Sequence, residues 1–395
     1  MTRRTEEIAG TPTVTASALT ARLAAATALV GVTALSAWLL ARATGSLPHL
    51  LPDYAQWQDQ AYRTVPQFLR WCLGDLTEAQ FYKSGIGALG LLAGAWLAHR
   101  GWRAGKRWAG FPICGGSGLW PWVLASASLG VLLSNLVWGA SIPATGAWQP
   151  TFVPFVSVPP AIVLVYGAGT AVALTGAVLG ALLTTPIALL IVNLVCYPLH
   201  LPAVIGSVTS MWIGALLAFG LCRHLPWMRR PAPAPAMAAP VHHGPVWVVR
   251  RVLADFTEAP FYGNELATLG LVAGTVLSYL LNPATPAYGS GLLPAMLTAQ
   301  TLAATVAVLV YRRCWARHGW YPTFVPVVSV APAAVLAYGA TVPAIVLGPV
   351  LGALAGPPLA AAIARRLPAS LPPFIGCVAA MTVCGLAILP LLGLL

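Results

Sequence analysis

The sequence predicts an all-α polytopic membrane protein with about eleven transmembrane helices. One N-terminal helix is followed by a five-plus-five inverted-topology repeat that contains proline-broken helices. Composition is the first indication: 58% of the 395 residues are hydrophobic and 8% are charged, which leaves too little polar surface to cover a soluble domain of this size. The other two indications are a duplicated sequence and the placement of basic residues along the chain.

Two motifs occur twice. Residues 148–167 return at 320–339 with 15 of 20 positions identical, and both copies read Pro-Thr-Phe-Val-Pro-x-Val-Ser-Val-x-Pro. An acidic motif precedes each copy, as Asp75-Leu-Thr-Glu-Ala-Gln-Phe-Tyr82 and as Asp255-Phe-Thr-Glu-Ala-Pro-Phe-Tyr262. Duplication in so apolar a chain is typical of inverted-repeat transporters.

Apolar runs mark the spans, because crossing ~30 Å of hydrocarbon takes about 20 residues. They lie near 24–41, 81–99, 119–140, 151–168, 170–196, 203–222, 262–282, 291–311, 322–340, 342–364 and 372–394. The unbroken stretches 151–199 and 322–364 are each too long for one span. We divide them at Gly167 and Gly339, where glycine permits a turn.

Basic residues predict the orientation. With the N-terminus in the cytoplasm, the arginine-rich loops at 100–107, 223–230 and 312–317 fall on the same side. The loops at 141–147, 197–202 and 283–290 contain no Lys or Arg, as the positive-inside rule requires for the outer face. Arg63 and Arg70 are exceptions. Since five spans is an odd number, the two copies are expected to lie upside down relative to each other.

Six regions follow from this topology, in an expected bacterial inner (plasma) membrane. They are a cytoplasmic N-terminal tail (1–23), an extra transmembrane helix (24–45), an external loop with an interfacial segment (46–72), repeat 1 (73–222), a basic Pro/Ala-rich cytoplasmic linker (223–247) and repeat 2 (248–395).

Charge and cysteine usage exclude several classes of protein. The formal net charge of +12 comes from arginines expected to face anionic headgroups, so the lipid bilayer is the expected partner and nucleic acid is not. The seven cysteines contain no CxxC pair, and His242-His243 has no third ligand at suitable spacing, so no disulfide or metal site is expected. Gly85-Ile-Gly-Ala-Leu-Gly90 fits GxGxxG inside an apolar span with no preceding strand, so no nucleotide or other cofactor is expected.

Glycines four residues apart recur in both copies, as in Gly90-x-x-x-Gly94 and Gly270-x-x-x-Gly274. Such a stripe lets two helix backbones approach closely. The pattern predicts tight packing and no chemistry.

The acidic motif has two interpretations. As a helix start, its Asp would be the N-cap and its Glu would reach back in a capping box. As a functional site, its carboxylates would couple transport to an ion or a proton, with Arg70 and Arg250 standing at the same offset to neutralise them. The carboxylates concerned are Asp75, Glu78, Asp255 and Glu258.

The proline-rich motif predicts a substrate site. Its prolines remove backbone donors and disfavour helix, and an interrupted helix in a bilayer must be buried in protein or line a cavity. The candidate substrate-binding residues, repeated in both copies, are Thr151, Phe152, Ser157, Thr323, Phe324 and Ser329. We expect Ser157 and Ser329 to lie close together near the midplane and to face a cavity. The alternative is a proline-kinked helix used only for packing.

These features predict a secondary transporter (a permease) that moves a small-molecule solute by alternating access around a midplane site. The alternatives are a passive channel for a small solute and a non-transport membrane subunit of a larger assembly. An enzyme is not expected, because the spans contain no nucleophile with a neighbouring base and no nucleotide loop. The scarcity of charge argues against a multiply charged substrate. The architecture resembles the five-plus-five repeats of several unrelated transporter families, and no motif selects one of them.

Overall fold

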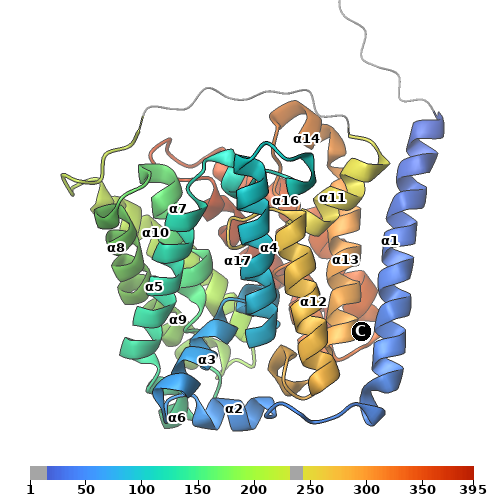
Figure 1. Ribbon diagram of the computed structural model, residues 1–395, viewed down its shortest axis with the longest axis horizontal. Helices are drawn as coiled ribbons and strands as arrows, with labels where there is room; N and C mark the ends of the chain where they lie inside the picture. Colours follow the sequence, from blue (N-terminus) through green and yellow to red (C-terminus); the bar gives the residue numbers. More distant parts are fainter. Residues whose placement is uncertain (1–15, 232–242) are drawn as a thin grey trace, which may run out of the picture.

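The computed structural model describes residues 16–231 and 243–395 (Figure 1). These two ranges are helical and contain no β-strand. The first fifteen residues of the predicted tail, and residues 232–242 of the predicted linker with His242, lie outside the described residues.

The first half of the chain contains ten α-helices within 16–231. They are α1 (Ala16–Ala43), α2 (Tyr54–Gln60), α3 (Val65–Asp75), α4 (Gly85–Arg103), α5 (Trp120–Trp138), α6 (Ser141–Thr145), α7 (Val158–Tyr166), α8 (Thr170–Leu179), α9 (Thr185–Ile191) and α10 (Ala203–Cys222). Two π-turns, Gly180–Thr184 and Val192–Cys196, join and extend α8 and α9, so that Thr170–Cys196 is one long helical segment.

The second half contains seven α-helices within 243–395. They are α11 (Pro245–Asp255), α12 (Glu265–Leu281), α13 (Leu293–Val310), α14 (Arg312–His318), α15 (Val330–Tyr338), α16 (Gly348–Ala364) and α17 (Phe374–Leu392). Proline stands in the first turn of α3, α5, α11 and α13. Its missing N–H costs nothing at that position.

Seven helices of the described chain are long and apolar enough to cross a membrane. They are Ser17–Ser46, Trp120–Trp138, Thr170–Cys196, Ala203–Cys222, Leu293–Val310, Pro343–Ala364 and Phe374–Leu392. The prediction of an all-helical fold with several candidate membrane-spanning helices is therefore confirmed for the described residues. The count of eleven is not confirmed, because α4, α12 and the helices within 151–168 and 322–340 are shorter or less apolar.

Helices α4 and α12 pack at backbone contact. A methyl group added to Gly90 would collide with the carbonyl of Gly270, and one added to Gly270 would collide with the carbonyl of Gly90. Each glycine thus touches its own duplicate. The predicted close packing of the glycine stripes is found here, since only glycine permits this approach.

The contacts one turn away fix the relative direction of these two helices. Gly94 faces the carbonyl of Leu266, and Gly274 faces the carbonyl of Ile86. Moving forward along α4 therefore corresponds to moving backward along α12. The two duplicated helices run antiparallel, and their contacts are reciprocal.

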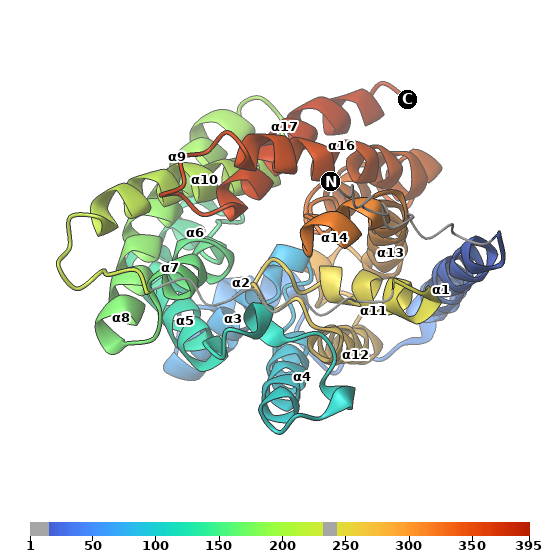
Figure 2. The same cartoon turned by 90° about the horizontal axis from the view of Figure 1, so that it is seen from above.

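A second contact between the halves joins α10 and α17. These helices lie side by side when the molecule is seen from above (Figure 2), and the hydroxyls of Thr209 and Thr382 are 3.3 Å apart. The sequence Ile-Gly-x-Val-x-x-Met occurs in both helices, beginning at Ile205 and at Ile375. The halves therefore meet through two pairs of related helices.

The proline-rich motifs form interrupted segments. Before α7, a short 3-10 turn (Val153–Val156) ends at Ser157, whose backbone is non-helical (φ −135°, ψ −112°). Ser329 before α15 has nearly the same geometry (φ −138°, ψ −94°). Each broken segment packs on a glycine of the following helix, because Gly180 lies against Pro159 and Gly352 lies against Pro326 and Val330.

Candidate functional site

The acidic motifs lie in two loops of the same shape. Each loop leaves a short helix, α3 or α11, and enters a long one, α4 or α12. Phe81 and Phe261 both have left-handed backbones (φ 67° and 64°), a conformation that bulky side chains rarely adopt. The hydroxyls of Thr77 and Thr257 accept hydrogen bonds from the backbone N–H groups of Ser84 and Asn264, the residues immediately before the long helices.

The capping interpretation of the acidic motif is wrong. Asp75 and Asp255 are the last residues of α3 and α11, so they stand at helix C-termini. The N-caps of α4 and α12 are Ser84, which accepts from Gly87 at 3.0 Å, and Asn264. A carboxylate at a helix C-terminus meets the negative end of the helix dipole. These two aspartates therefore need nearby donors or cations.

The first cluster surrounds Asp75. Lys83 forms an ion pair with it and lies 3.2 Å from Glu78. The other carboxylate oxygen of Asp75 accepts hydrogen bonds from Asn135 at 2.7 Å and from Thr151 at 3.1 Å. All five side chains are buried. The low dielectric of a buried site makes this pairing electrostatically strong.

Aromatic rings complete the first cluster. The Lys83 ammonium lies 3.6 Å from the ring centroid of Trp71, within cation–π range. The indole of Trp148 donates to Glu78 at 3.2 Å. The second oxygen of Glu78 is buried without a hydrogen-bond partner.

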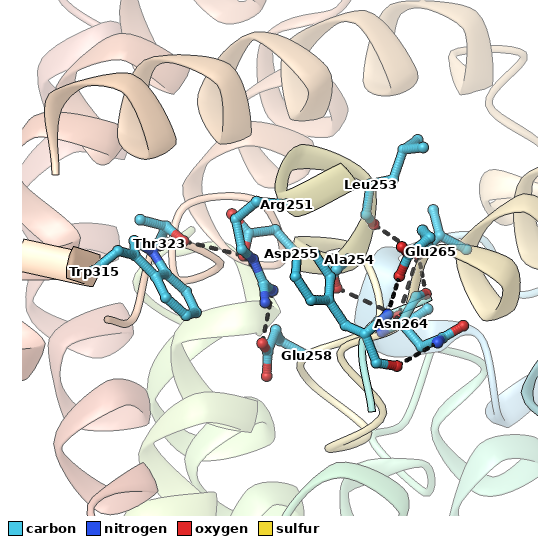
Figure 3. Close-up of polar contacts among 12 residues, drawn as sticks. Arg251, Leu253, Ala254, Asp255, Glu258, Asn264, Glu265, Trp315 and Thr323 are labelled. Atoms are coloured by element: carbon cyan, nitrogen blue, oxygen red, sulfur yellow. Dashed lines mark hydrogen bonds and ion pairs between the residues drawn. The ribbon is translucent and has the colours of Figure 1, made fainter. Parts of the chain in front are cut away.

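The second cluster surrounds Asp255 (Figure 3). Arg251 donates to Asp255 at 2.8 Å and to Glu258 at 2.6 Å. Thr323 donates to Asp255 at 3.1 Å, as Thr151 does to Asp75. The guanidinium lies 4.7 Å from the centroid of Trp315. In each copy a cation therefore bridges the motif's Asp and Glu, and the proline-rich motif's Thr binds the Asp.

The cations are not those that the sequence suggested. Arg70 is exposed, and Arg250 pairs with Glu265 at 2.5 Å, outside both clusters. Lys83 and Arg251 take their place. A lysine at the start of an apolar span could have signalled this role, because burying a charge there is costly.

The two cations occupy different positions in the repeat. Lys83 aligns with Gly263, whereas Arg251 aligns with Trp71. Comparing the two copies for shared residues therefore hides both cations. The clusters are alike in chemistry and differ in the residue that supplies the positive charge.

Each cluster contains two carboxyl groups and one cation, which leaves one excess negative charge when all are ionised. Burial raises the pKa of Glu78 to about 8, against the opposing attraction of Lys83. Burial likewise raises the pKa of Asp255 to about 7, against the attraction of Arg251. Asp75 adds to the rise at Glu78, and Glu258 adds to that at Asp255. Each cluster can thus hold one proton near neutral pH.

A cavity of about 1010 Å³ lies between the two halves. Equivalent residues of both copies line it in pairs. These pairs include Glu78 and Glu258, Ala79 and Ala259, Phe81 and Phe261, Trp148 and Trp320, Phe152 and Phe324, Val156 and Val328, Val208 and Val378, and Met211 and Met381. The lining is mostly apolar and aromatic.

The predicted substrate residues separate into three groups. Phe152 and Phe324 line the cavity. Thr151 and Thr323 instead bind the two aspartates. Ser157 and Ser329 do not line the cavity, contrary to expectation.

The serine hydroxyls are used locally. Ser157 donates to the carbonyl of Val153 at 2.5 Å, and Ser329 donates to the carbonyl of Val325 at 2.6 Å. Both carbonyls lie four residues back, where the helix is interrupted. The serines therefore satisfy the broken backbone, which a polar side chain commonly does in such a place.

A direct hydrogen bond connects the two acidic motifs. The side chain of Gln80 donates to the carbonyl of Phe256 at 2.8 Å. Gln300 of α13 donates to the carbonyl of Gln80 at 3.2 Å and accepts from Tyr82 at 2.8 Å. The loops are thus fixed to each other across the boundary between the halves.

Comparison with protein-family models, curated proteins and solved structures finds no match to this chain. Function is therefore argued from the site alone.

Proposed function

We propose that the protein is a secondary transporter of a small solute. In this proposal the chain crosses the membrane eleven times, with the N-terminus in the cytoplasm of a bacterial cell, and residues 73–222 and 248–395 form an inverted repeat. The solute occupies the cavity between the halves. The acidic clusters couple its movement to a proton or another cation.

The antiparallel α4–α12 pair supports the inverted repeat. Gly90 and Gly270 occupy the same place in the two copies and touch each other reciprocally. Such a contact arises when a two-fold axis in the membrane plane passes between them. The helices α3 and α11, which lead into the acidic loops, lie in the lower and the upper part of Figure 1.

One observation favours transport above the alternatives: a single cavity is lined by equivalent residues of both copies and by a carboxyl group from each acidic cluster. In transporters built from repeats, the substrate site lies at the interface of the repeats, and one repeat rocks against the other around it. In this proposal, binding and release of a proton or cation at Glu78 and Glu258 drives the change between the two orientations of the cavity.

A passive channel is the second candidate, because the cavity lining includes residues of loops at both ends, such as His200 and Pro372. A channel opens to both faces at once, whereas a carrier opens to one face at a time. Accessibility from the two sides of the membrane therefore separates these functions.

Cysteine accessibility tests the proposal. Ala79 and Ala259 both line the cavity beside the glutamates, and each can become Cys, one variant at a time, in a chain whose seven native cysteines are replaced. Reference cysteines at residues 104 and 145 are expected to react from the cytoplasmic and the outer face respectively. For a carrier, locking one cavity cysteine with a bulky impermeant reagent from its open side should suppress opening to the other side.

Three outcomes decide among the candidates. Simultaneous labelling of one cavity cysteine from both faces indicates a channel. Absence of labelling from either face favours a non-transport subunit. Labelling of residues 104 and 145 from the same side contradicts the inverted repeat itself.

Proton binding makes stability depend on pH. Glu78 has an ordinary pKa of 4.5, raised to about 8 by burial, so between these values the folded protein holds a proton that the unfolded chain has lost. Stability should therefore fall as pH rises from 6 to 9. In Glu78→Gln the neutral form is permanent, and we expect a smaller fall in the midpoint of thermal unfolding over this range.

The matched control is Asp59→Asn, because Asp59 is an exposed carboxylate paired with Arg63 outside the clusters. It should keep the wild-type pH dependence. A Glu78→Gln variant that also keeps the full wild-type dependence would contradict proton binding at Glu78.

A further inference from the structure

The charges around the cavity are arranged asymmetrically. Of the described residues that line it, none is Lys or Arg, and Glu78 and Glu258 are the carboxylic acids. Lys83 and Arg251 bind these carboxyl groups but are absent from the lining. A molecule in the cavity can therefore contact Glu78 and Glu258, whereas Lys83 and Arg251 lie behind these two side chains.

Two residues that line the cavity each have a buried oxygen atom without a hydrogen-bond partner. Glu78 is 1% exposed, and its second carboxylate oxygen has no partner. The hydroxyl of Tyr54, which also lines the cavity, is buried without a partner. A buried polar group without a hydrogen-bond partner costs free energy, and a ligand that pairs with it removes that cost. An unpartnered carboxylate oxygen and an unpartnered hydroxyl oxygen on two lining residues favour a ligand with positive charge.

Aromatic rings from both copies line the cavity. Near Glu78, the ring of Trp148 lies 6.1 Å from Phe152 and 6.2 Å from Tyr288, measured between centroids. On the other side, Trp320 lies 6.5 Å from Phe324. Ring faces attract cations, most strongly where water is excluded. The apolar remainder of the lining suits a hydrophobic body.

We propose that this cavity binds a hydrophobic organic cation, which pairs with Glu78 or Glu258 and stacks against the neighbouring aromatic rings. This proposal rests on the proposed function and names its substrate class. The volume of about 1010 Å³ lies at the upper end of small-molecule sites, which span roughly 300–1,000 Å³. An anion is disfavoured, because none of the described lining residues is a Lys or Arg that could balance its charge.

Two probes of opposite charge and nearly the same shape test the substrate class. Tetraphenylphosphonium and tetraphenylborate each present four phenyl rings. Binding to the full-length protein in detergent micelles is measured by equilibrium dialysis, with protein-free micelles as the blank. We expect saturable binding of the phosphonium and no saturable binding of the borate.

Isosteric variants locate the binding. Glu78→Gln and Glu258→Gln preserve side-chain shape but cannot ionise to pair with a cation, and at least one should weaken phosphonium binding about tenfold or more. Asp59→Asn changes an exposed carboxylate that does not line the cavity and should leave binding unchanged. Size-exclusion chromatography identifies any variant that misfolds, and the second glutamate provides an independent variant.

The proposal is overturned if the borate binds as well as the phosphonium, if neither binds, or if both folded Gln variants bind the phosphonium with wild-type affinity. These results leave the transport proposal standing when the cysteines at 79 and 259 still show alternating access. Loss of that access as well would remove the transporter assignment with it.

Discussion

Replacing Gly90 with alanine is expected to destabilise the protein more than any other single-methyl change in its long helices. The added methyl group would collide with the backbone carbonyl of Gly270, and a backbone cannot move aside as a flexible side chain can. Overpacking of this kind costs about 1–3 kcal/mol or more. We expect the midpoint of thermal unfolding in detergent to fall by several degrees, and Gly270→Ala should behave in the same way.

Gly220→Ala is the matched control. Gly220 lies within α10, and nothing stands within 4 Å of a methyl group placed there. Alanine is favoured over glycine in a helix by about 1 kcal/mol, so this variant should be unchanged or slightly more stable. Equal behaviour of Gly90→Ala and Gly220→Ala would contradict the backbone contact between α4 and α12.

Replacing Lys83 with methionine is also expected to lower the stability of the protein strongly. Methionine keeps much of the packing against Trp71 but leaves Asp75 and Glu78 without their cation. Removing one partner of a buried ion pair costs about 3–5 kcal/mol, because the remaining charge is left uncompensated. Purified Lys83→Met should unfold at a much lower temperature than the wild type, with the largest loss at high pH, where Glu78 loses its proton.

Rescue distinguishes charge from packing. Adding Asp75→Asn to Lys83→Met removes the orphaned carboxylate, while an amide can still accept from Asn135 and Thr151. We expect much of the lost stability to return. The surface pair offers the comparison, since Arg63→Met breaks an exposed ion pair with Asp59 and such pairs contribute little. If the double variant is no more stable than Lys83→Met, the loss reflects packing alone.

Some features of this protein could be predicted because they depend on residue type and spacing along the chain alone. Low charge and long apolar runs predict membrane helices. The glycine stripes predict close packing of helix backbones, which α4 and α12 show. Phe152 and Phe324 were expected beside a substrate, and they line the cavity. Glu78 and Glu258 line it too.

Other features depend on geometry that the sequence does not contain. An Asp near a helix boundary suits an N-cap, yet the sequence does not reveal that a helix ends at Asp75. The cations were missed because Lys83 and Arg251 stand at different positions in the two copies. The serines were misassigned because a hydroxyl beside a broken helix can turn back to its own backbone, as Ser157 does.

The glycine contact also bears on how the chain is assembled in the cell. Gly90 and Gly270 are 180 positions apart, and a ribosome adding roughly 5–20 residues per second needs on the order of 10–40 seconds to make that stretch. Helix α4 is therefore synthesised long before its central partner exists. Until α12 has been inserted antiparallel to α4, the glycine face of α4 must be covered by lipid, another helix or an insertion factor. Biogenesis of the first half is thus incomplete until the second half has been inserted.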